Sequence, residues 1–172
     1  MSSRVLVRMA MYLAMFAVLD YVAATSGLFR MPQGGSLGLG AIALILATLD
    51  LGFAKGLLLA LVSIPLQQIT SGPLWYLHWF QFALDYVLAY GAYALVVLFP
   101  IYKIDGFHVI TGVIVANTLR FGFHVLSGMW YYEVPLMGSL IYNAWYMVPT
   151  LILTFVLLGG IVPRLNLQTS NK

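Results

Sequence analysis

The chain is dominated by long apolar stretches that carry very few charges. Of its 172 residues, 62% are hydrophobic and only 8% are charged, and the mean hydropathy is +0.96. About 20 mostly apolar residues suffice for a helix to cross a membrane, whereas a soluble domain carries about 25% charged residues. The composition therefore predicts an integral membrane protein embedded in a lipid bilayer.

Segments rich in proline, glycine and polar residues divide the apolar sequence into six stretches. The sequence FRMPQGGS at 29–36 and the polar segment 100–106 are predicted loops, and Pro65 is expected to kink the third helix. These signals predict an all-α, six-transmembrane-helix bundle that forms a single domain over residues 1–172. The predicted helices cover about 5–26, 37–49, 56–69, 78–98, 107–130 and 139–161.

The basic residues are distributed unevenly between the two sides of this predicted bundle. Six spans place both termini on one side, and cytoplasmic loops are enriched in lysine and arginine. Only Arg30 falls in a loop on the opposite side, so we expect both termini to be cytoplasmic. The residues on the side of the termini are Arg4, Arg8, Lys55, Lys103, Arg164 and Lys172.

Several function classes lack their sequence signatures. The chain has no G-x-x-x-x-G-K-[ST] phosphate loop, no HExxH and no GxSxG motif, so neither an ATPase nor an enzyme is expected. It has no cysteine, which excludes disulfides and thiolate metal sites. No tract is basic enough to bind nucleic acid. We therefore expect no catalytic residue, no metal site and no cofactor.

Ionisable side chains inside the predicted helices are the strongest sign of function. Asp20, Asp85, Arg120 and His124 lie toward one face of the bilayer, on three helices. Such groups cost at least about 2.5 kcal/mol each in hydrocarbon and usually face a protein interior or a water-filled cavity. Their similar depth predicts a polar pocket that opens to the outside.

Neighbouring polar residues extend this predicted pocket onto two helix faces. Asn117, Arg120, His124 and Gly128 follow a spacing that places them on one side of the fifth helix. A second polar face occupies the start of the sixth helix, with Ser139, Tyr142, Asn143 and Tyr146. Two acids and one arginine, among aromatic residues, suit a small organic cation or a heteroaromatic ligand.

Each of these residues also has a structural interpretation. Arg120 could neutralise Asp85 or Asp20 in a buried ion pair, Asn143 could join two helices, and Gly128 could serve helix packing. Asp85 with His124 could instead form the proton relay of a proton-coupled carrier. The four tryptophans near the external end, at 75, 79, 130 and 145, could form an interfacial belt or line the pocket.

Small residues at four-residue spacing mark the first helix. Ala10-x-x-x-Ala14, followed by Ala17, would allow a second helix to approach closely. The partner could be another helix of the same chain or a separate membrane protein.

Four segments, in this order, give the chain a family resemblance: MPQGGS at 31–36, FALDY at 82–86, RFGFHVLSG at 120–128 and SLIYNAWYMVP at 139–149. With them, the chain resembles the thiamine-specific S components of energy-coupling factor (ECF) vitamin transporters over nearly its whole length. The resemblance implies a thiamine-binding subunit of a prokaryotic plasma membrane. Its partners would be an ECF module of one membrane coupling subunit and two ATPase subunits.

The resemblance also assigns roles to individual residues. Asp85 matches the family's acidic ligand residue, Ala10 and Ala14 match the contact with the coupling subunit, and the loop 31–36 resembles a lid over the pocket. Further ligand-binding positions are Tyr86, Arg120, His124, Gly128, Tyr132, Ser139, Asn143 and Trp75, and Trp130 is a candidate stacking residue.

Two departures from the family affect the expected ligand geometry. Gly138 stands where tyrosine is common, and the segment 28–36 lacks a tryptophan that some members use to cover the ligand. The alternatives to thiamine capture are therefore an S component for a different vitamin or a thiamine precursor, and the stand-alone proton-coupled carrier.

Overall fold

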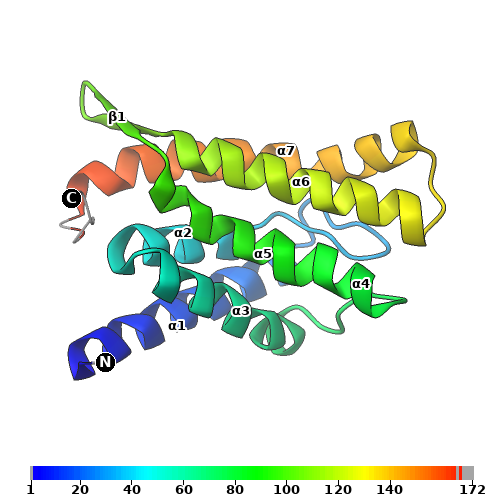
Figure 1. The fold of residues 1–172 in the computed structure, drawn as a ribbon, viewed down its shortest axis with the longest axis horizontal. Coiled ribbons are helices and arrows are strands. Elements are labelled where there is room, and N and C mark those ends of the chain that lie inside the picture. Colours follow the sequence, from blue (N-terminus) through cyan, green and yellow to red (C-terminus); the bar gives the residue numbers. More distant parts are fainter. Residues whose placement is uncertain (1, 166, 168–172) are drawn as a thin grey trace.

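The computed structural model describes residues 2–165 and 167, and Figure 1 shows its elements. Helices make up most of these residues, as the apolar stretches predict. In chain order the elements are α1 (Ser3–Ser26), α2 (Gly40–Leu51), α3 (Phe53–Thr70), α4 (Trp79–Phe82), η1 (Ala83–Leu88), α5 (Ala89–Gly91), η2 (Ala92–Leu98), β1 (Ile101–Ile104), β2 (Phe107–Ile110), α6 (Thr111–Tyr131), α7 (Leu136–Ile161) and η3 (Val162–Arg164).

The short helix α2 forms the centre of the molecule. Every residue from Gly40 to Asp50 is buried, because α1, α3, η2 and α7 all pack against it. A helix that is apolar on all sides is stable only in such surroundings. Gly52 alone separates α2 from α3, so the connection is much shorter than the gap of 50–55 between the predicted helices 37–49 and 56–69. α3 continues through Pro65 to Thr70.

The second half of the chain adds three antiparallel segments. α4, η1, α5 and η2 follow one another without a break from Trp79 to Leu98, and they run beside α6. α6 in turn packs along α7, as Figure 1 shows. Within the first of these segments, η1 is a π-helical turn and η2 is a 3₁₀ helix. α7 ends at Ile161, as predicted for the sixth helix, and the 3₁₀ turn η3, which contains Pro163, follows it.

The predicted loop at 100–106 and the predicted start of the fifth helix at Phe107 are both wrong. Ile101–Ile104 pairs with Phe107–Ile110 in an antiparallel β-hairpin, and α6 begins at Thr111. The turn residues Asp105 and Gly106 both have positive φ, at 39° and 79°. This is the requirement of the tightest hairpin turns, for which Asp-Gly between β-branched and aromatic residues is a strong signal.

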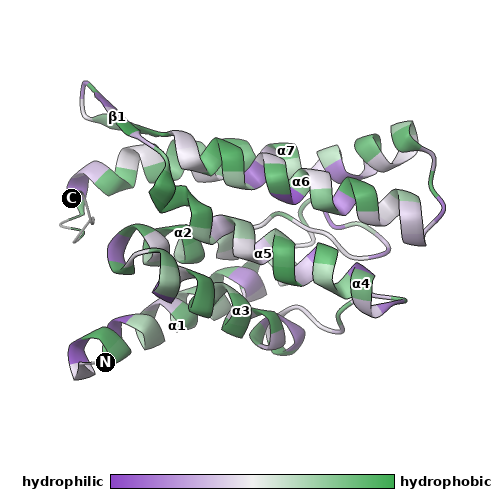
Figure 2. Cartoon of the chain, in the orientation of Figure 1, coloured by the Kyte–Doolittle hydropathy of each residue, from purple (hydrophilic) through white to green (hydrophobic). Residues whose placement is uncertain are grey.

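The distribution of side chains is that of a membrane protein. Among the described residues, four helical segments are long and apolar enough to cross a bilayer, over Ser3–Ser26, Phe53–Thr70, Trp79–Leu98 and Leu136–Arg164. Many large apolar side chains on these helices point outward, while Asp20, Gln81 and Arg120 are buried. In Figure 2, most of the helical ribbon has the colour of hydrophobic residues, and hydrophilic bands interrupt the α6–α7 pair.

The two ends of the bundle differ. The start of α1, the short helix η3 and the β-hairpin lie at one end, at the left of Figure 1. The connections 27–39, 71–78 and 132–135 lie toward the other end, and all three contribute residues to a cavity between the helices. This arrangement puts the polar residues of α1, η1, α6 and α7 under one set of loops.

Candidate functional site

A cavity of about 280 Å³ lies beneath these loops. Its walls come from α1, the end of α3, η1, α5, α6 and α7, and the loops 30–38 and 71–75 complete it. Small-molecule sites enclose about 300–1,000 Å³ and combine apolar or aromatic walls with a few polar groups. The cavity is close to the lower limit of this range, so it has room for one small ligand.

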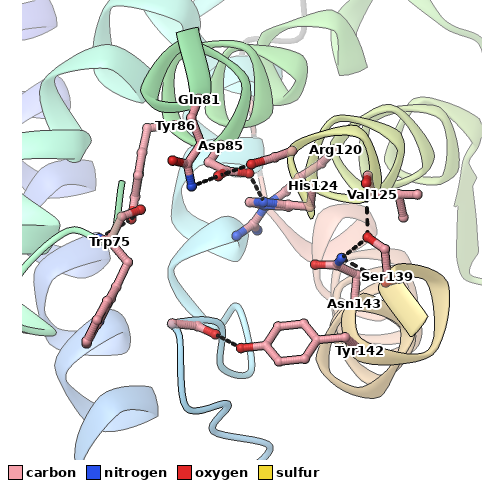
Figure 3. A network of polar contacts seen from close by, with 12 residues as sticks. Trp75, Gln81, Asp85, Tyr86, Arg120, His124, Val125, Ser139, Tyr142 and Asn143 are labelled. Carbon is pink, nitrogen blue, oxygen red and sulfur yellow. Dashed lines mark hydrogen bonds and ion pairs between the residues drawn. The ribbon is translucent and has the colours of Figure 1, made fainter. Parts of the chain in front are cut away.

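Asp85 presents its carboxylate at the cavity wall and is held there by three hydrogen bonds. Nδ1 of His124 lies 2.8 Å from Oδ1, and the Ser127 hydroxyl donates to Oδ2 over 2.5 Å. The Gln81 amide also donates to Oδ2, over 3.3 Å (Figure 3). The Asp85 side chain stays 12% exposed. A carboxylate can accept about four hydrogen bonds, so it keeps acceptor capacity toward the cavity.

The helix that carries Asp85 is irregular at this point. The π-helical turn Ala83–Leu88 contains both Asp85 and Tyr86. Such turns are rare and occur frequently at functional sites, because they change the direction in which side chains leave a helix. Gln81, fully buried, also accepts a 2.6 Å hydrogen bond from the backbone N–H of Leu77, which ties the start of this span to the preceding loop.

Arg120 makes no ion pair with either acid within the described residues, so the predicted pairing with Asp85 or Asp20 is wrong. Its Nη1 donates to the hydroxyl of Tyr93 over 2.6 Å, and its Nε donates to Nε2 of His124 over 3.3 Å. The guanidinium carbon lies 5.1 Å from the ring centroid of Tyr90. Aromatic faces and an imidazole ring therefore surround this charge, an arrangement that guanidinium tolerates better than ammonium does.

Asp20 instead joins α1 to the end of α3. It accepts a hydrogen bond from the Thr70 hydroxyl over 2.5 Å and another from the Ser71 hydroxyl. The residue is 8% exposed and lies on the cavity wall. The same carboxylate thus anchors the beginning of the loop 71–78, whose Trp75 reaches the cavity mouth.

The α7 side of the cavity is built by close contact with α6. A methyl group added at Gly128 would lie 2.3 Å from Oγ of Ser139, so only glycine permits this approach. The Ser139 hydroxyl donates to the carbonyl of Val125 over 2.9 Å. One turn further, Asn143 accepts a 2.8 Å hydrogen bond from Tyr146 and donates to the carbonyl of Ser139.

Two tyrosines fasten the loops that cover the cavity. The hydroxyl of Tyr86 accepts from the N–H of Trp75 over 2.8 Å. The hydroxyl of Tyr142 accepts from the N–H of Gln33 and donates to the carbonyl of Gly34, both over 3.1 Å. A methyl group added at Gly34 would lie 3.2 Å from Cδ1 of Trp75, so the two loops meet at the cavity mouth.

Most residues proposed from the sequence come together in this cavity. Trp130 does not, because it is 62% exposed and lies outside the lining, so its role in ligand stacking stays a prediction without geometric support. Tyr132, just beyond α6, does line the cavity, and burial raises the pKa of its phenol, which keeps it neutral. The residues that line the cavity are Trp75, Asp85, Tyr86, Arg120, His124, Gly128, Tyr132, Ser139 and Asn143.

Other members of the site escaped the sequence analysis. Gln81 and Ser127 hold the Asp85 carboxylate, and Tyr90 and Tyr93 surround Arg120. A signal existed for Gln81 and Asp85, since they are four residues apart on one helix. Nothing in the sequence places Ser127 or Tyr93 next to these side chains, because the contacts depend on how separate helices pack.

The fold and the site define a multi-pass membrane protein with a cavity of the size of a small solute between its helices, which is the design of a membrane transport protein. The family model described as thiamine transporter protein (Thia_YuaJ) matches residues 6–169. The thiamine transporter ThiT of Bacillus subtilis (strain 168) is 33% identical over 171 residues, covering 89% of this chain and 87% of that protein. The chain therefore belongs to the thiamine transporter family, which confirms the resemblance and the expectation of a transporter rather than an enzyme.

Proposed function

We propose that the protein is the thiamine-capture subunit of an ECF-type importer in a prokaryotic plasma membrane. The observation that carries this proposal is the Asp85 carboxylate, fixed by three donors and partly open to a cavity with aromatic walls. Thiamine combines a permanently cationic thiazolium ring with an aminopyrimidine. A carboxylate and tyrosine faces match both parts.

Each proposed ligand contact follows from the chemistry of the wall. Asp85 accepts a hydrogen bond from the amino group of the pyrimidine or offsets the ring charge. The rings of Tyr86 and Tyr132 stack on a ligand ring, and Trp75 covers the mouth. The hydroxyethyl arm meets the polar side chains of α7, with Ser139 and Asn143 nearest to the Gly128 contact.

The proposed topology has six spans with both termini in the cytoplasm. The central helix α2 has only 12 residues, about 18 Å, so it spans the bilayer only together with its flanking segments. α6 is long enough but less apolar, because it carries Asn117, Arg120 and His124. Support for the orientation comes from Arg4, in α1, and from the elements β1 and η3, which carry Lys103 and Arg164 at the same end of the bundle as the start of α1. Lys172 lies outside the described residues. The cavity loops then face the extracellular side.

The proposed ECF module would dock on α1. Ala10 and Ala14 are both exposed, so their spacing does not serve packing within the described part of this chain. Together with Leu6 and Val7, they form a smooth apolar strip on which a coupling-subunit helix could lie closely. The two ATPase subunits would supply the energy of ATP hydrolysis, because this chain has no phosphate-loop motif of its own.

One observation favours a second candidate, the stand-alone proton-coupled carrier. His124 and Asp85 form a 2.8 Å pair inside the membrane, and such pairs form proton relays in carriers. An S component for another vitamin or a thiamine precursor is a third candidate, because Gly138 brings no side chain to the cavity lining at a position where tyrosine is common in the family. The position is also crowded, since a methyl group there would lie 2.9 Å from Cγ1 of Val134.

The deciding experiment separates binding from energy coupling. The purified protein is titrated with thiamine, with its pyrimidine and thiazole precursors and with riboflavin, and its tryptophan fluorescence is recorded. We expect submicromolar thiamine binding and weaker binding of the precursors. In proteoliposomes, we expect accumulation only with the coupling and ATPase subunits and ATP. Accumulation driven by a pH gradient in the protein alone would favour the carrier.

A further inference from the structure

A continuous chain of hydrogen bonds links Arg120, His124 and Asp85 along the cavity wall. Nε of Arg120 donates to Nε2 of His124 over 3.3 Å, and Nδ1 of the same ring lies 2.8 Å from Oδ1 of Asp85. Arg120 and His124 lie one turn apart on α6, whereas Asp85 comes from η1 on the neighbouring span (Figure 3).

The direction of the first hydrogen bond determines the protonation state of the histidine. A guanidinium group has only N–H donors and keeps its proton at any physiological pH. Nε2 of His124 must therefore provide a lone pair, which excludes the imidazolium form in this arrangement. The single ring proton then resides on Nδ1, from which it is donated to the Asp85 carboxylate.

Arg120 is itself fixed, so this donor is held in place. Nη1 donates to the Tyr93 hydroxyl over 2.6 Å, and the guanidinium lies over the rings of Tyr90 and Tyr93, at 5.1 and 5.6 Å from their centroids. Arg120 is 8% exposed, and no carboxylate forms an ion pair with it in the described part of the chain. Its full positive charge thus acts on the adjacent imidazole.

We infer that Arg120 is a positioning residue that keeps His124 neutral, with its proton on Nδ1 and directed at Asp85. The consequence for the site is electrostatic. A protonated His124 would neutralise Asp85 and would place a second cation beside a positively charged ligand. With Arg120 present, Asp85 keeps its charge for the ligand, so binding should not change as pH falls toward 6. This last step rests on the proposed binding of thiamine.

The other ionisable groups around His124 do not set its protonation state. Tyr146 of α7 faces the ring at 6.3 Å between centroids, and Tyr86 of η1 and Tyr132 lie on the same cavity wall. Phenols stay neutral between pH 6 and 8. Asp20 of α1 is bonded to Thr70 and Ser71, and Arg30 belongs to the exposed part of the loop at the mouth. Asp85 and Arg120 are therefore the charged groups in direct contact with the imidazole.

The first test needs no ligand. The chain has three histidines, so ¹⁵N-labelled imidazoles give few NMR signals, and His124→Gln identifies those of His124. We expect the neutral Nδ1–H tautomer in the wild-type protein from pH 8 to pH 6. An imidazolium, or a neutral ring with its proton on Nε2, at pH 7 would overturn the inference, whether or not thiamine binds.

The second test uses the pH profile of thiamine binding. In Arg120→Met the imidazole can accept a second proton, so thiamine binding should weaken as the pH falls from 8 to 6. We expect a flat profile in the wild type and a largely flat one in Arg120→Lys, which keeps the charge. Arg4→Met is the matched control, because Arg4 is exposed at the start of α1.

The outcomes separate this inference from the proposed function. If the wild-type protein fails to bind thiamine but shows the Nδ1–H tautomer, the proposed function is lost and the role of Arg120 in setting the tautomer stands. If Arg120→Met binds thiamine with the same flat profile as the wild type, Arg120 has only a structural role. Should Arg120→Met fail to fold, the pH profile of Arg120→Lys and the tautomer of His124 in the wild-type protein still test the inference.

Discussion

The hydroxyl of Tyr142 on α7 donates a hydrogen bond to the carbonyl oxygen of Gly34 and accepts one from the N–H of Gln33, both over 3.1 Å. One side chain thus fastens the loop between α1 and α2 to the far wall of the cavity. In the same loop, Gly35 has a φ of +92° and packs against α7, where a methyl group would lie 2.7 Å from the ring of Tyr146. The covering loop is seated on α7 by contacts that require glycine.

Removal of the Tyr142 hydroxyl should loosen the loop over the cavity without abolishing thiamine binding. Tyr142→Phe loses two hydrogen bonds worth about 1 kcal/mol each at most. We expect thiamine to dissociate roughly fivefold to thirtyfold faster, with a smaller change in the association rate, as measured by stopped-flow fluorescence. Tyr102→Phe, on the exposed face of the hairpin, is the control. Equal dissociation rates in the two variants would show that the loop is held by other contacts.

The charge of Asp85 is expected to dominate ligand affinity. Asp85→Asn keeps the size of the side chain but removes the negative charge that faces a cationic ligand, so affinity should fall by more than tenfold, or about 1.4 kcal/mol. Calorimetric titration with thiamine measures this directly. Asp105→Asn, in the hairpin turn, is the matched control, since asparagine accepts its positive φ. Unchanged affinity in Asp85→Asn would remove Asp85 from the binding site.

Substitution by alanine at two glycines of α6 should change the stability of the protein in opposite directions. Gly128→Ala places a methyl group 2.3 Å from Oγ of Ser139 and should cost about 1–3 kcal/mol through overpacking. Gly122→Ala meets nothing within 4 Å and should stabilise the helix by about 0.5–1 kcal/mol. Thermal unfolding in detergent gives the sign of each change.

A third variant tests the cause of the expected loss. In the double variant Gly128→Ala/Ser139→Ala, the conflicting oxygen is gone and the nearest remaining atom of the side chain is Cβ, at 3.2 Å. Part of the lost stability should return. A double variant no more stable than Gly128→Ala would place the conflict elsewhere than at the serine hydroxyl.

The exposed alanines of α1 should matter for transport and not for capture. Ala10→Trp or Ala14→Trp adds bulk to a face that packs against nothing in the described chain, so thiamine binding should stay within about twofold, a few tenths of a kcal/mol. ATP-dependent uptake with the coupling module should be lost. Ile152→Trp, at an exposed position on α7, is the control for bulk in the membrane. Uptake at the wild-type rate in both alanine variants would argue against docking on this face.

The membrane class and most helices could be predicted from the sequence because hydrophobicity and helix-breaking residues act locally. The helix ends agree within a few residues for α1, α3 and α7. The hairpin is not predicted although Asp105-Gly106 is a local signal, because a short polar segment between two apolar stretches is equally typical of a simple loop. The clustering of Asp85, Arg120 and His124 was anticipated from the high cost of burying such groups in hydrocarbon.

What the sequence by itself determined is which segments are apolar helices of a membrane protein and which polar side chains need a protein interior. Only the tertiary structure decided how these side chains pair: Asp20 with Thr70 and Ser71, Asp85 with His124, and Arg120 with Tyr93. The physical reason is that a hydrogen bond depends on distances within a few tenths of an ångström between separate helices. Those distances follow from helix packing, such as the contact at Gly128, and no local pattern along the chain specifies them.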